Sequence, residues 1–249
     1  MIEENPWPIE VLVEIFKWLS IEERLQQLAP VCKLFYQVVH TPKFWKIVDT
    51  NSEFTLSSFH SVFGHAKHIT HLGFRYSQRQ LGCSNLIENA LNDCVNLVHL
   101  DLAYNTSIFT LNVIQSMPFL RHLDITSCQN VKESSLTLSL KNKRGLQVLK
   151  MGNCFQIEGN ALVSIIRNLP DVRNVVANWC GSISVEQARN VLQQCKLLAF
   201  SFSPCWGPPN LWEEFVQDFK HIEFGEDLLD HIKRVNLPGF LYEIGRAHV

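Results

Sequence analysis

The chain has 249 residues, 46% of them hydrophobic, and a formal net charge of −2 at pH 7. These values are ordinary for one or two globular domains, and they disfavour nucleic-acid binding, which needs a basic surface. No apolar run approaches the roughly 18 residues of a membrane span, and the opening MIEENPWP is acidic where a signal peptide is basic. We therefore expect no nucleic-acid or membrane partner, and a location in the cytoplasm or also the nucleus.

Residues 1–48 predict a compact unit of three short helices. The first is expected to open at Pro8, because a first-turn residue needs no backbone donor. Its apolar residues recur at i, i+3, i+4 and i+7, which predicts one apolar face made of Leu12, Ile15, Phe16 and Leu19. The second helix is expected from Pro30 and the third from Thr41-Pro42. A unit this short cannot bury all of its large apolar residues, so part of that surface should contact a partner.

Residues 49–68 are polar and rich in serine and threonine. We interpret them as a connection, or as a degenerate first repeat whose strand is Ile47-Val48.

A nine-residue sequence motif then recurs over residues 69–225. Its copies are ITHLGFRYS, LVHLDLAYN, LRHLDITSC, LQVLKMGNC, VRNVVANWC and LLAFSFSPC, which start at Ile69, Leu97, Leu120, Leu146, Val172 and Leu197. They share the frame L-x-x-L-x-L-x-x-C/N at a spacing of roughly 20 to 30 residues, which indicates a solenoid. Each frame predicts a short parallel strand, and each following segment predicts a helix, so that stacked units share one core. The expected helix residues include the set Leu136, Leu138 and Leu140.

The repeat pattern loosens after Ser203. We expect a helix with an apolar stripe from Leu211 to Phe219, a last strand over residues 221–224 and a final helix from Glu226 to Val235. Terminal solenoid units are commonly atypical because one side faces water, so residues 226–249 are interpreted as a cap and tail.

The chain has eight cysteines, so the expected location inside the cell must be weighed against possible disulfide bonds. Four of them stand at the ninth place of the frame, namely Cys128, Cys154, Cys180 and Cys205. Neighbouring ninth places would lie about 5 Å apart, where disulfides are not excluded, but buried reduced thiols are the better interpretation without a secretory signal. No cysteine or histidine spacing is typical of zinc, and we assign no metal and no cofactor.

The third, fifth and seventh places of the frame should project onto the concave face, where solenoids commonly bind partners. The candidate binding residues there, together with the tryptophan that follows one strand, are His71, Arg75, His99, Asp101, His122, Asp124, Lys150, Asn174, Asn178 and Trp179. The three histidines beside two aspartates could ligate a metal or sense pH. A polar face that a protein partner contacts is the favoured interpretation.

Aromatic residues just after the strands are a second candidate surface: Tyr76, Tyr104, Phe155, Trp179 and Trp206. Rigid aromatics at a rim are typical interaction anchors, but they are equally suited to packing the loops of adjacent repeats.

The N-terminal unit resembles the F-box. The resemblance rests on Pro8-Ile9-Glu10, then Ile15-Phe16 with Leu19, then Val31-Cys32-Lys33, and finally Phe44-Trp45. Trp7 stands where the family usually has leucine and Phe35 where it has tryptophan, so both places stay large and apolar. With the cysteine-type repeats that follow, nearly the whole chain is similar to the F-box/leucine-rich-repeat family. The fold class it implies is α/β, with a three-helix F-box before a curved leucine-rich-repeat solenoid that has strands inside and helices outside.

The resemblance implies a non-catalytic substrate receptor of an SCF-type (Skp–cullin–F-box) ubiquitin ligase. The F-box would bind the Skp adaptor, and through it a cullin–RING ligase, while the repeats would bind a protein substrate. The residues expected to face the adaptor or to support that face are Pro8, Ile9, Leu12, Ile15, Phe16, Leu19 and Val31. The alternative is a scaffolding protein that binds partners without ubiquitination. A hydrolase with a Cys–His site is the least favoured interpretation, because no cysteine stands apart as a nucleophile.

Overall fold

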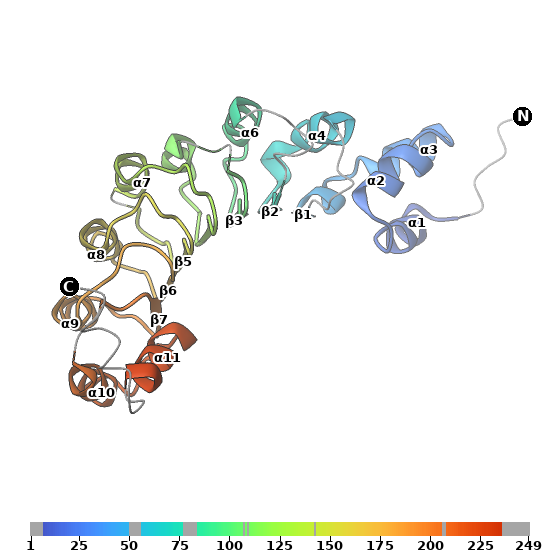
Figure 1. The fold of residues 1–249 in the computed structure, drawn as a ribbon. Helices are drawn as coiled ribbons and strands as arrows, with labels where there is room; N and C mark the ends of the chain where they lie inside the picture. The colour runs from blue at the N-terminus through green and yellow to red at the C-terminus, as the bar shows by residue number, and fades with distance from the viewer. Residues whose placement is uncertain are drawn as a thin grey trace, which may run out of the picture.

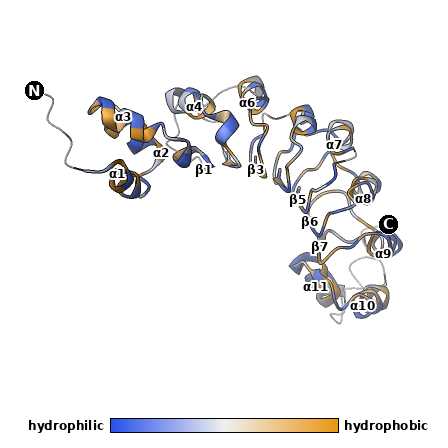
Figure 2. Cartoon of the chain, turned by 180° about the vertical axis from the view of Figure 1, so that it is seen from behind, coloured by the Kyte–Doolittle hydropathy of each residue, from blue (hydrophilic) through white to orange (hydrophobic). Residues whose placement is uncertain are grey.

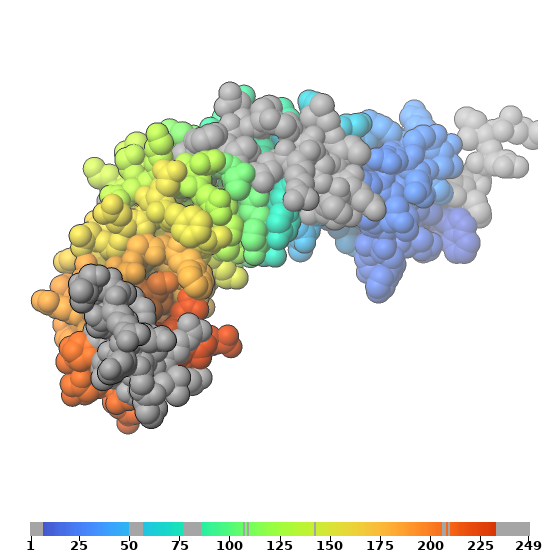
Figure 3. Space-filling view, viewed as in Figure 1, coloured from blue at the N-terminus to red at the C-terminus, as the bar shows by residue number. Residues whose placement is uncertain are grey.

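The computed structural model describes residues 7–49, 56–76, 84–106, 108, 110–141, 143–205 and 208–235. In this part of the chain, short strands line the inner side of a curved arc and most helices lie on its outer side (Figure 1). A helical N-terminal unit forms one end of the arc. The space-filling view shows the inner side as a broad hollow between that unit and the last repeats (Figure 3). The predicted fold class is confirmed.

Within the described ranges, eight strands form one parallel sheet in strict chain order. They are β1 Ile47–Asp49, β2 His71–Gly73, β3 His99–Asp101, β4 His122–Asp124, β5 Val148–Lys150, β6 Asn174–Ala177, β7 Ala199–Phe202 and β8 Glu223–Phe224. The register pairs equal places of the frame, as the sequence predicts: His71 lies opposite His99, and His99 opposite His122. Strand β1 begins at Ile47, where the sequence suggests the strand of a degenerate first repeat, and it pairs with β2, so the sheet starts before the expected boundary at residue 48.

The outer side carries one helical segment for most repeats: α4 Leu56–Phe63, η3 Ala66–His68, α6 Ser84–Leu91, η4 Asn112–Ser116, α7 Glu133–Leu140, α8 Gly159–Arg167, α9 Val185–Gln194 and α10 Pro209–Asp218. Two details differ from the sequence prediction. The segment η4 is a 3-10 helix, because the repeat that contains it has the shortest spacing and leaves too few residues for a full α-helix. Leu138 is 55% exposed between buried Leu136 and Leu140, because residues two apart point to different sides of a helix.

The N-terminal unit consists of α1 Ile9–Phe16, α2 Ile21–Glu23, the π-helix η1 Arg24–Leu28, α3 Lys33–Val39 and the 3-10 helix η2 Pro42–Trp45. Ser20 and Glu23 form a capping box that starts α2. The second predicted helix begins at Lys33 and not at Pro30, with the Cys32 thiol accepting a hydrogen bond from the amide of Phe35 as its N-cap. In Figure 2, parts of both α1 and α3 have the colour of hydrophobic residues.

The ninth-place side chains form a buried ladder through the solenoid. Asn105 Nδ2 donates to the carbonyl of Phe74 (2.6 Å) in the preceding repeat, and also to the carbonyl of Leu102 (2.8 Å) in its own. The ninth-place cysteines of the following repeats also donate to a backbone carbonyl of the preceding repeat. Cys128 donates to the carbonyl of Leu102, Cys154 to that of Ile125 and Cys180 to that of Met151, at 2.9–3.2 Å. Burial raises the pKa of the Cys128 thiol to about 12 and that of Cys180 to about 11. These cysteines are free thiols and act as structural donors.

The C-terminal part confirms the final strand and helix. Helix α11, Glu226–Val235, has the predicted bounds. It contacts β7 and lies on the inner side of the sheet, opposite the outer helices (Figures 1 and 2). Leu228 is buried there, and Gly225 approaches Ser201 so closely that a side chain at residue 225 would collide with it. Helix α11 therefore closes the concave face at its C-terminal end.

Candidate functional site

Helix α1 has a second apolar face that points away from the protein. Val11, Ile15 and Trp18 project from this side, and Trp18, just after the helix, is 83% exposed. A shallow hollow of about 640 Å³ beside them is lined by Glu10, Val11, Glu14, Ile15, Trp18 and Leu19. Because exposed large apolar side chains next to one another commonly mark a docking surface, we define Val11, Ile15 and Trp18 as the α1 face.

The predicted adaptor-facing residues divide into two groups. Pro8, Ile9, Ile15 and Val31 are exposed, and Leu19 is half-buried. Leu12 and Phe16 are both buried at 3% exposure, and Phe16 packs edge-to-face on Phe35 with ring centroids 4.9 Å apart. These two residues are therefore core residues that support the α1 face from beneath. Sequence analysis missed Val11 and Trp18, because a single helical stripe accounts for only one side of a helix.

An aromatic cluster joins the N-terminal unit to the first repeat. His65, which follows α4, stacks on buried Trp45 of η2 with ring centroids 4.6 Å apart and an interplanar angle of 8°. His65 Nε2 lies 2.9 Å from His40 Nδ1 at the end of α3, so one imidazole donates to the other. This contact requires a neutral acceptor nitrogen. The junction is thus built from packed rings and not from a free linker, which fixes the N-terminal unit against the sheet.

The junction predicts a loss of stability in acid. Burial lowers the pKa of both His40 and His65, and for His65 the neighbouring His40 adds to the effect. A histidine whose folded-state pKa lies below its unfolded value of about 6.5 stabilises the fold fully above that pH and progressively less below it, because the unfolded chain then binds more protons. We expect the urea midpoint of the full chain to fall as pH is lowered from 7.5 to 5.5.

A His65→Phe variant tests the cause. Phenylalanine keeps a ring on Trp45 but cannot titrate, so the variant should lose less stability in acid than the wild type, although His99 and His122 still contribute to the pH slope. The control is His60→Gln, since His60 is exposed on α4. An acid-induced loss in His65→Phe as large as that in the wild type would rule out the junction as its source.

The fifth and seventh places of the concave face hold an ionic network. Arg75 Nε donates to Asp101 at 2.5 Å, and Asp124 lies 4.0 Å from both Arg75 and Lys150. Each aspartate also accepts a hydrogen bond from the backbone amide two residues later. As a result, Asp101 and Asp124 are only 6% and 8% exposed. The structure corrects the expectation that these carboxylates are open on the concave face: they are largely covered and already paired.

The three predicted histidines lie side by side at the third place. Ring centroids are 5.8 Å apart for His71 and His99 and 5.2 Å apart for His99 and His122. Burial lowers the pKa of His99 and His122, and the neighbouring cationic and imidazole groups add to the effect. Among the described residues, no group of three or more His, Cys, Asp or Glu side chains has the arrangement of a metal site. This column of imidazoles places hydrogen-bonding nitrogens on the concave face.

The remaining predicted residues lie on β6 and the turn after it. Asn174 is half-buried on the concave face, and Asn178 accepts a hydrogen bond from Ser201 Oγ at 2.5 Å. Trp179 is 65% exposed, while its backbone amide donates to Ser203 Oγ. They form a group separate from the histidine column, with β5 between.

The eighth place of the frame adopts the left-handed backbone conformation in five repeats. The residues are Tyr76, Tyr104, Ser127, Asn153 and Trp179, with φ between 57° and 65°. The first four donate their amides to the seventh-place carbonyl of the next repeat, which offsets part of the roughly 1–3 kcal/mol that such a conformation costs a residue other than glycine. Sequence analysis missed this feature, because no glycine marks the position.

The same conformation holds aromatic side chains along the rim. Tyr76 and Tyr104 stack on each other, with ring centroids 4.5 Å apart and an angle of 9°, and both stay exposed. Phe155 and Trp179 are also exposed. The two tyrosines thus pack adjacent loops while presenting their outer surface, so the two interpretations of the rim coexist there. Trp206 lies outside the described residues.

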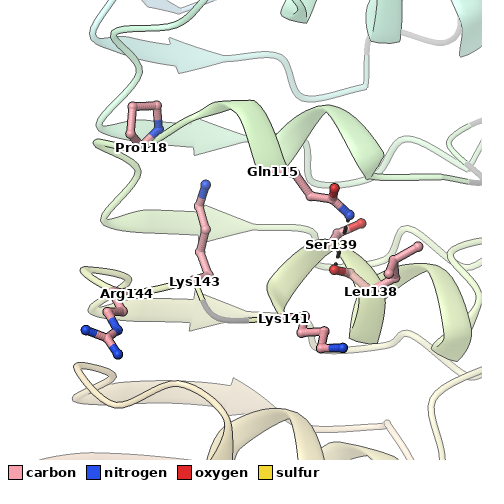
Figure 4. Close-up of a pocket in the computed structure, with 7 residues that line it drawn as sticks. All are labelled: Gln115, Pro118, Leu138, Ser139, Lys141, Lys143 and Arg144. Carbon is pink, nitrogen blue, oxygen red and sulfur yellow. Dashed lines mark hydrogen bonds between the residues drawn. The ribbon is translucent and has the colours of Figure 1, made fainter.

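A polar pocket of about 410 Å³ on the outer side has a structural explanation (Figure 4). Buried Lys143 points toward the end of η4 and donates to the carbonyls of Ile114 and Met117, both at 2.5 Å. Its burial lowers the pKa of Lys143 to about 8. Lys141 and Arg144 point away from it in different directions. The cations do not converge on one point, so we assign no anion site here.

In the comparison with known protein families, residues 8–51 match the F-box-like family. Those residues contain α1 through β1. We refer to residues 8–51, which match this family, as the F-box-like domain. The α1 face belongs to this F-box-like domain, and so do His40 and Trp45 of the junction. No curated protein matches the chain.

The fold as a whole is similar to that of a solved structure. A chain in the crystal structure of the yeast Rad7 and Elc1 complex aligns with a TM-score of 0.52 and 15% sequence identity. The alignment covers 75% of this chain and 60% of that chain, so this protein spans less than two thirds of its structural neighbour. An F-box-like domain before a parallel α/β solenoid is the arrangement that the sequence resemblance predicts. None of the helices in the described ranges is long and apolar enough to cross a membrane.

Proposed function

We propose that this protein is a substrate-recognition subunit of an SCF-type ubiquitin ligase, which binds the Skp adaptor through its F-box-like domain and a protein substrate through its repeats. The observation that carries the proposal is the α1 face. Ile15 and Trp18 are half or more exposed within a domain that matches the F-box-like family. Burying them against an adaptor would remove apolar surface from water, at about 25 cal/mol per Å².

The junction supports a role in positioning a substrate. The stack of His65 on Trp45 fixes the sheet relative to the F-box-like domain. A substrate on the concave face would therefore be held at a defined place relative to the adaptor and to the ubiquitin-charged enzyme beyond it. The protein would catalyse no covalent step itself. Its contribution would be to raise the effective concentration of the substrate at the ubiquitin-charged enzyme.

Affinity capture of the full chain from cells, together with a ubiquitination assay of the captured partners, tests this proposal. We expect the Skp adaptor and a cullin in the captured complex, and we expect captured partners to be ubiquitinated. Capture of the adaptor without a cullin would favour the scaffolding alternative. Absence of the adaptor would refute both the adaptor assignment and the ligase assignment.

A further inference from the structure

The imidazoles of His99 and His122 form a sheltered patch at the middle of the concave face. Both side chains are half-buried, and their rings are in contact. No ring nitrogen of either residue bonds to another described residue, whereas His71 Nδ1 at the edge of the column lies 3.0 Å from Thr70 Oγ1. A neutral imidazole has one donor and one acceptor nitrogen, so this patch offers unused hydrogen-bonding groups in a partly desolvated setting.

The charges around the patch favour an anion. Lys150 on β5 and Arg121, directly before β4, are both exposed and lie near His122. The carboxylates on the same face are compensated, since Asp101 pairs with Arg75, and Asp124 lies between Arg75 and Lys150. Asp49 on β1 is the remaining acid near Arg75. Lys150 is shared with Asp124, so the cation beside His122 that has no ion-pair partner among the described residues is Arg121.

We propose that His99 and His122, with Lys150 and Arg121 beside them, bind a segment of the substrate rich in aspartate or glutamate, and that this binding takes up protons. The inference rests on the proposed function for its use of the concave face as the substrate surface. Carboxylates fit better than phosphates, because phosphate recognition commonly uses a cluster of arginines. Arg75 is already engaged by Asp101, which leaves Arg121 as the guanidinium beside the two histidines.

Proton uptake follows from the surroundings of the two rings. In the free protein, burial and neighbouring groups lower the pKa of His99 and His122, so both rings are neutral at pH 7.5. A carboxylate against an imidazole favours the charged ring and raises its pKa. Binding must then strengthen as pH falls, by about ten-fold for each unit by which the bound pKa exceeds the free one.

Acidic residues at the C-terminal end of the third-place column limit where an acidic segment can bind. Strand β8 places Glu223 in register with Ala199 of β7, and Glu226 begins α11 beside it. Both glutamates are exposed and would repel an acidic segment. We therefore place the segment over β3, β4 and β5, away from the C-terminal cap.

Fluorescence anisotropy with a labelled hexaglutamate peptide and the full chain tests the proposal. We expect the affinity at pH 6.0 to exceed that at pH 8.0 by about ten-fold or more, and we expect hexalysine to bind no better than an uncharged glutamine peptide. The double variant His99→Gln, His122→Gln should lose both the binding and its pH dependence. His60→Gln, on the outer helix α4, is the matched control and should behave as the wild type. Circular dichroism at both pH values verifies that each protein remains folded.

Equal hexaglutamate affinity at the two pH values, preference for hexalysine, or unchanged binding by the double variant would each overturn the inference. Imidazole titration by NMR gives an independent readout, since the pKa of His99 and His122 should rise when the peptide is added. Adaptor capture by the same preparations separates the two proposals. The double variant should keep the adaptor, so a failure of peptide binding leaves the ligase assignment intact. Loss of adaptor capture with intact histidine-dependent peptide binding would refute the adaptor assignment and leave the binding of an acidic segment intact.

Discussion

Replacing Ile15 and Trp18 with aspartate should abolish capture of the Skp adaptor by the full chain while leaving its fold intact. Both side chains are half or more exposed, so the substitutions remove little from the core of the F-box-like domain. In a complex they would be buried apolar anchors, and anchors of this kind commonly contribute 2 kcal/mol or more each. Losing two of them corresponds to a decrease in affinity of several hundred-fold or more.

Co-purification of the co-expressed adaptor, followed by titration of the purified proteins, measures this effect. Leu138→Asp is the matched control, since Leu138 is an equally exposed apolar residue on the outer helix α7 and lies outside the F-box-like domain. It should retain the adaptor fully. Phe16 is unsuitable for the test, because it is buried against Phe35 and its replacement would unfold the unit. Wild-type adaptor binding by the folded Ile15, Trp18 double variant would refute the α1 face as the docking surface.

The arrangement of the solenoid follows from its sequence, because one repeat period controls many contacts. Once the frame is aligned, the register of His71, His99 and His122 is fixed, and the structure confirms it. The inward direction of the ninth place is confirmed as well, since Asn105 and Cys128 are both fully buried. Even the bounds of α11 were predictable, since its segment ends at a turn-forming Asn-Leu-Pro-Gly sequence.

The candidate surfaces were harder to predict, because exposure depends on neighbours from other repeats. Asp101 alternates with buried residues and looks open in the sequence. Arg75, which belongs to the preceding repeat, covers it. Trp18 shows the opposite error: its size suggests a core residue, yet no element of the described structure covers it. Its position just after α1 was the available signal, since Trp18 continues the helix side that carries Val11 and Ile15.

The left-handed turns were not predictable from residue type. Tyr104 and Trp179 are poor candidates for positive φ, and the conformation arises from the ladder itself, in which the eighth-place amide reaches the next repeat. The turn then directs the ninth side chain beneath the strand. The exposed aromatic rim and the buried ladder are therefore two consequences of one backbone feature.

Asn105→Ala should destabilise the central repeats by about 2–4 kcal/mol. Asn105 is fully buried, and its amide nitrogen donates to the carbonyls of Phe74 and Leu102. Alanine removes both bonds at a fully buried site, and the loss of a donor to a buried carbonyl costs about 1–3 kcal/mol. The carbonyl of Leu102 still accepts a hydrogen bond from the Cys128 thiol, so the larger part of the lost stability should arise at Phe74.

Two further variants make the test specific, with urea unfolding and amide hydrogen exchange at β2, β3 and β4 as measurements. Asn105→Cys places the residue of the following repeats at this position, so its thiol can donate to Phe74 as Cys128 does to Leu102. We expect this variant to lose about half as much stability as Asn105→Ala. Asn96→Ala removes a bond of similar length, from Asn96 Nδ2 to the carbonyl of Lys67 (2.8 Å), but at an exposed site where water replaces the donor. It should lose less than about 1 kcal/mol. If Asn105→Ala proves no more harmful than Asn96→Ala, the ninth-place ladder contributes volume to the core and not hydrogen bonds.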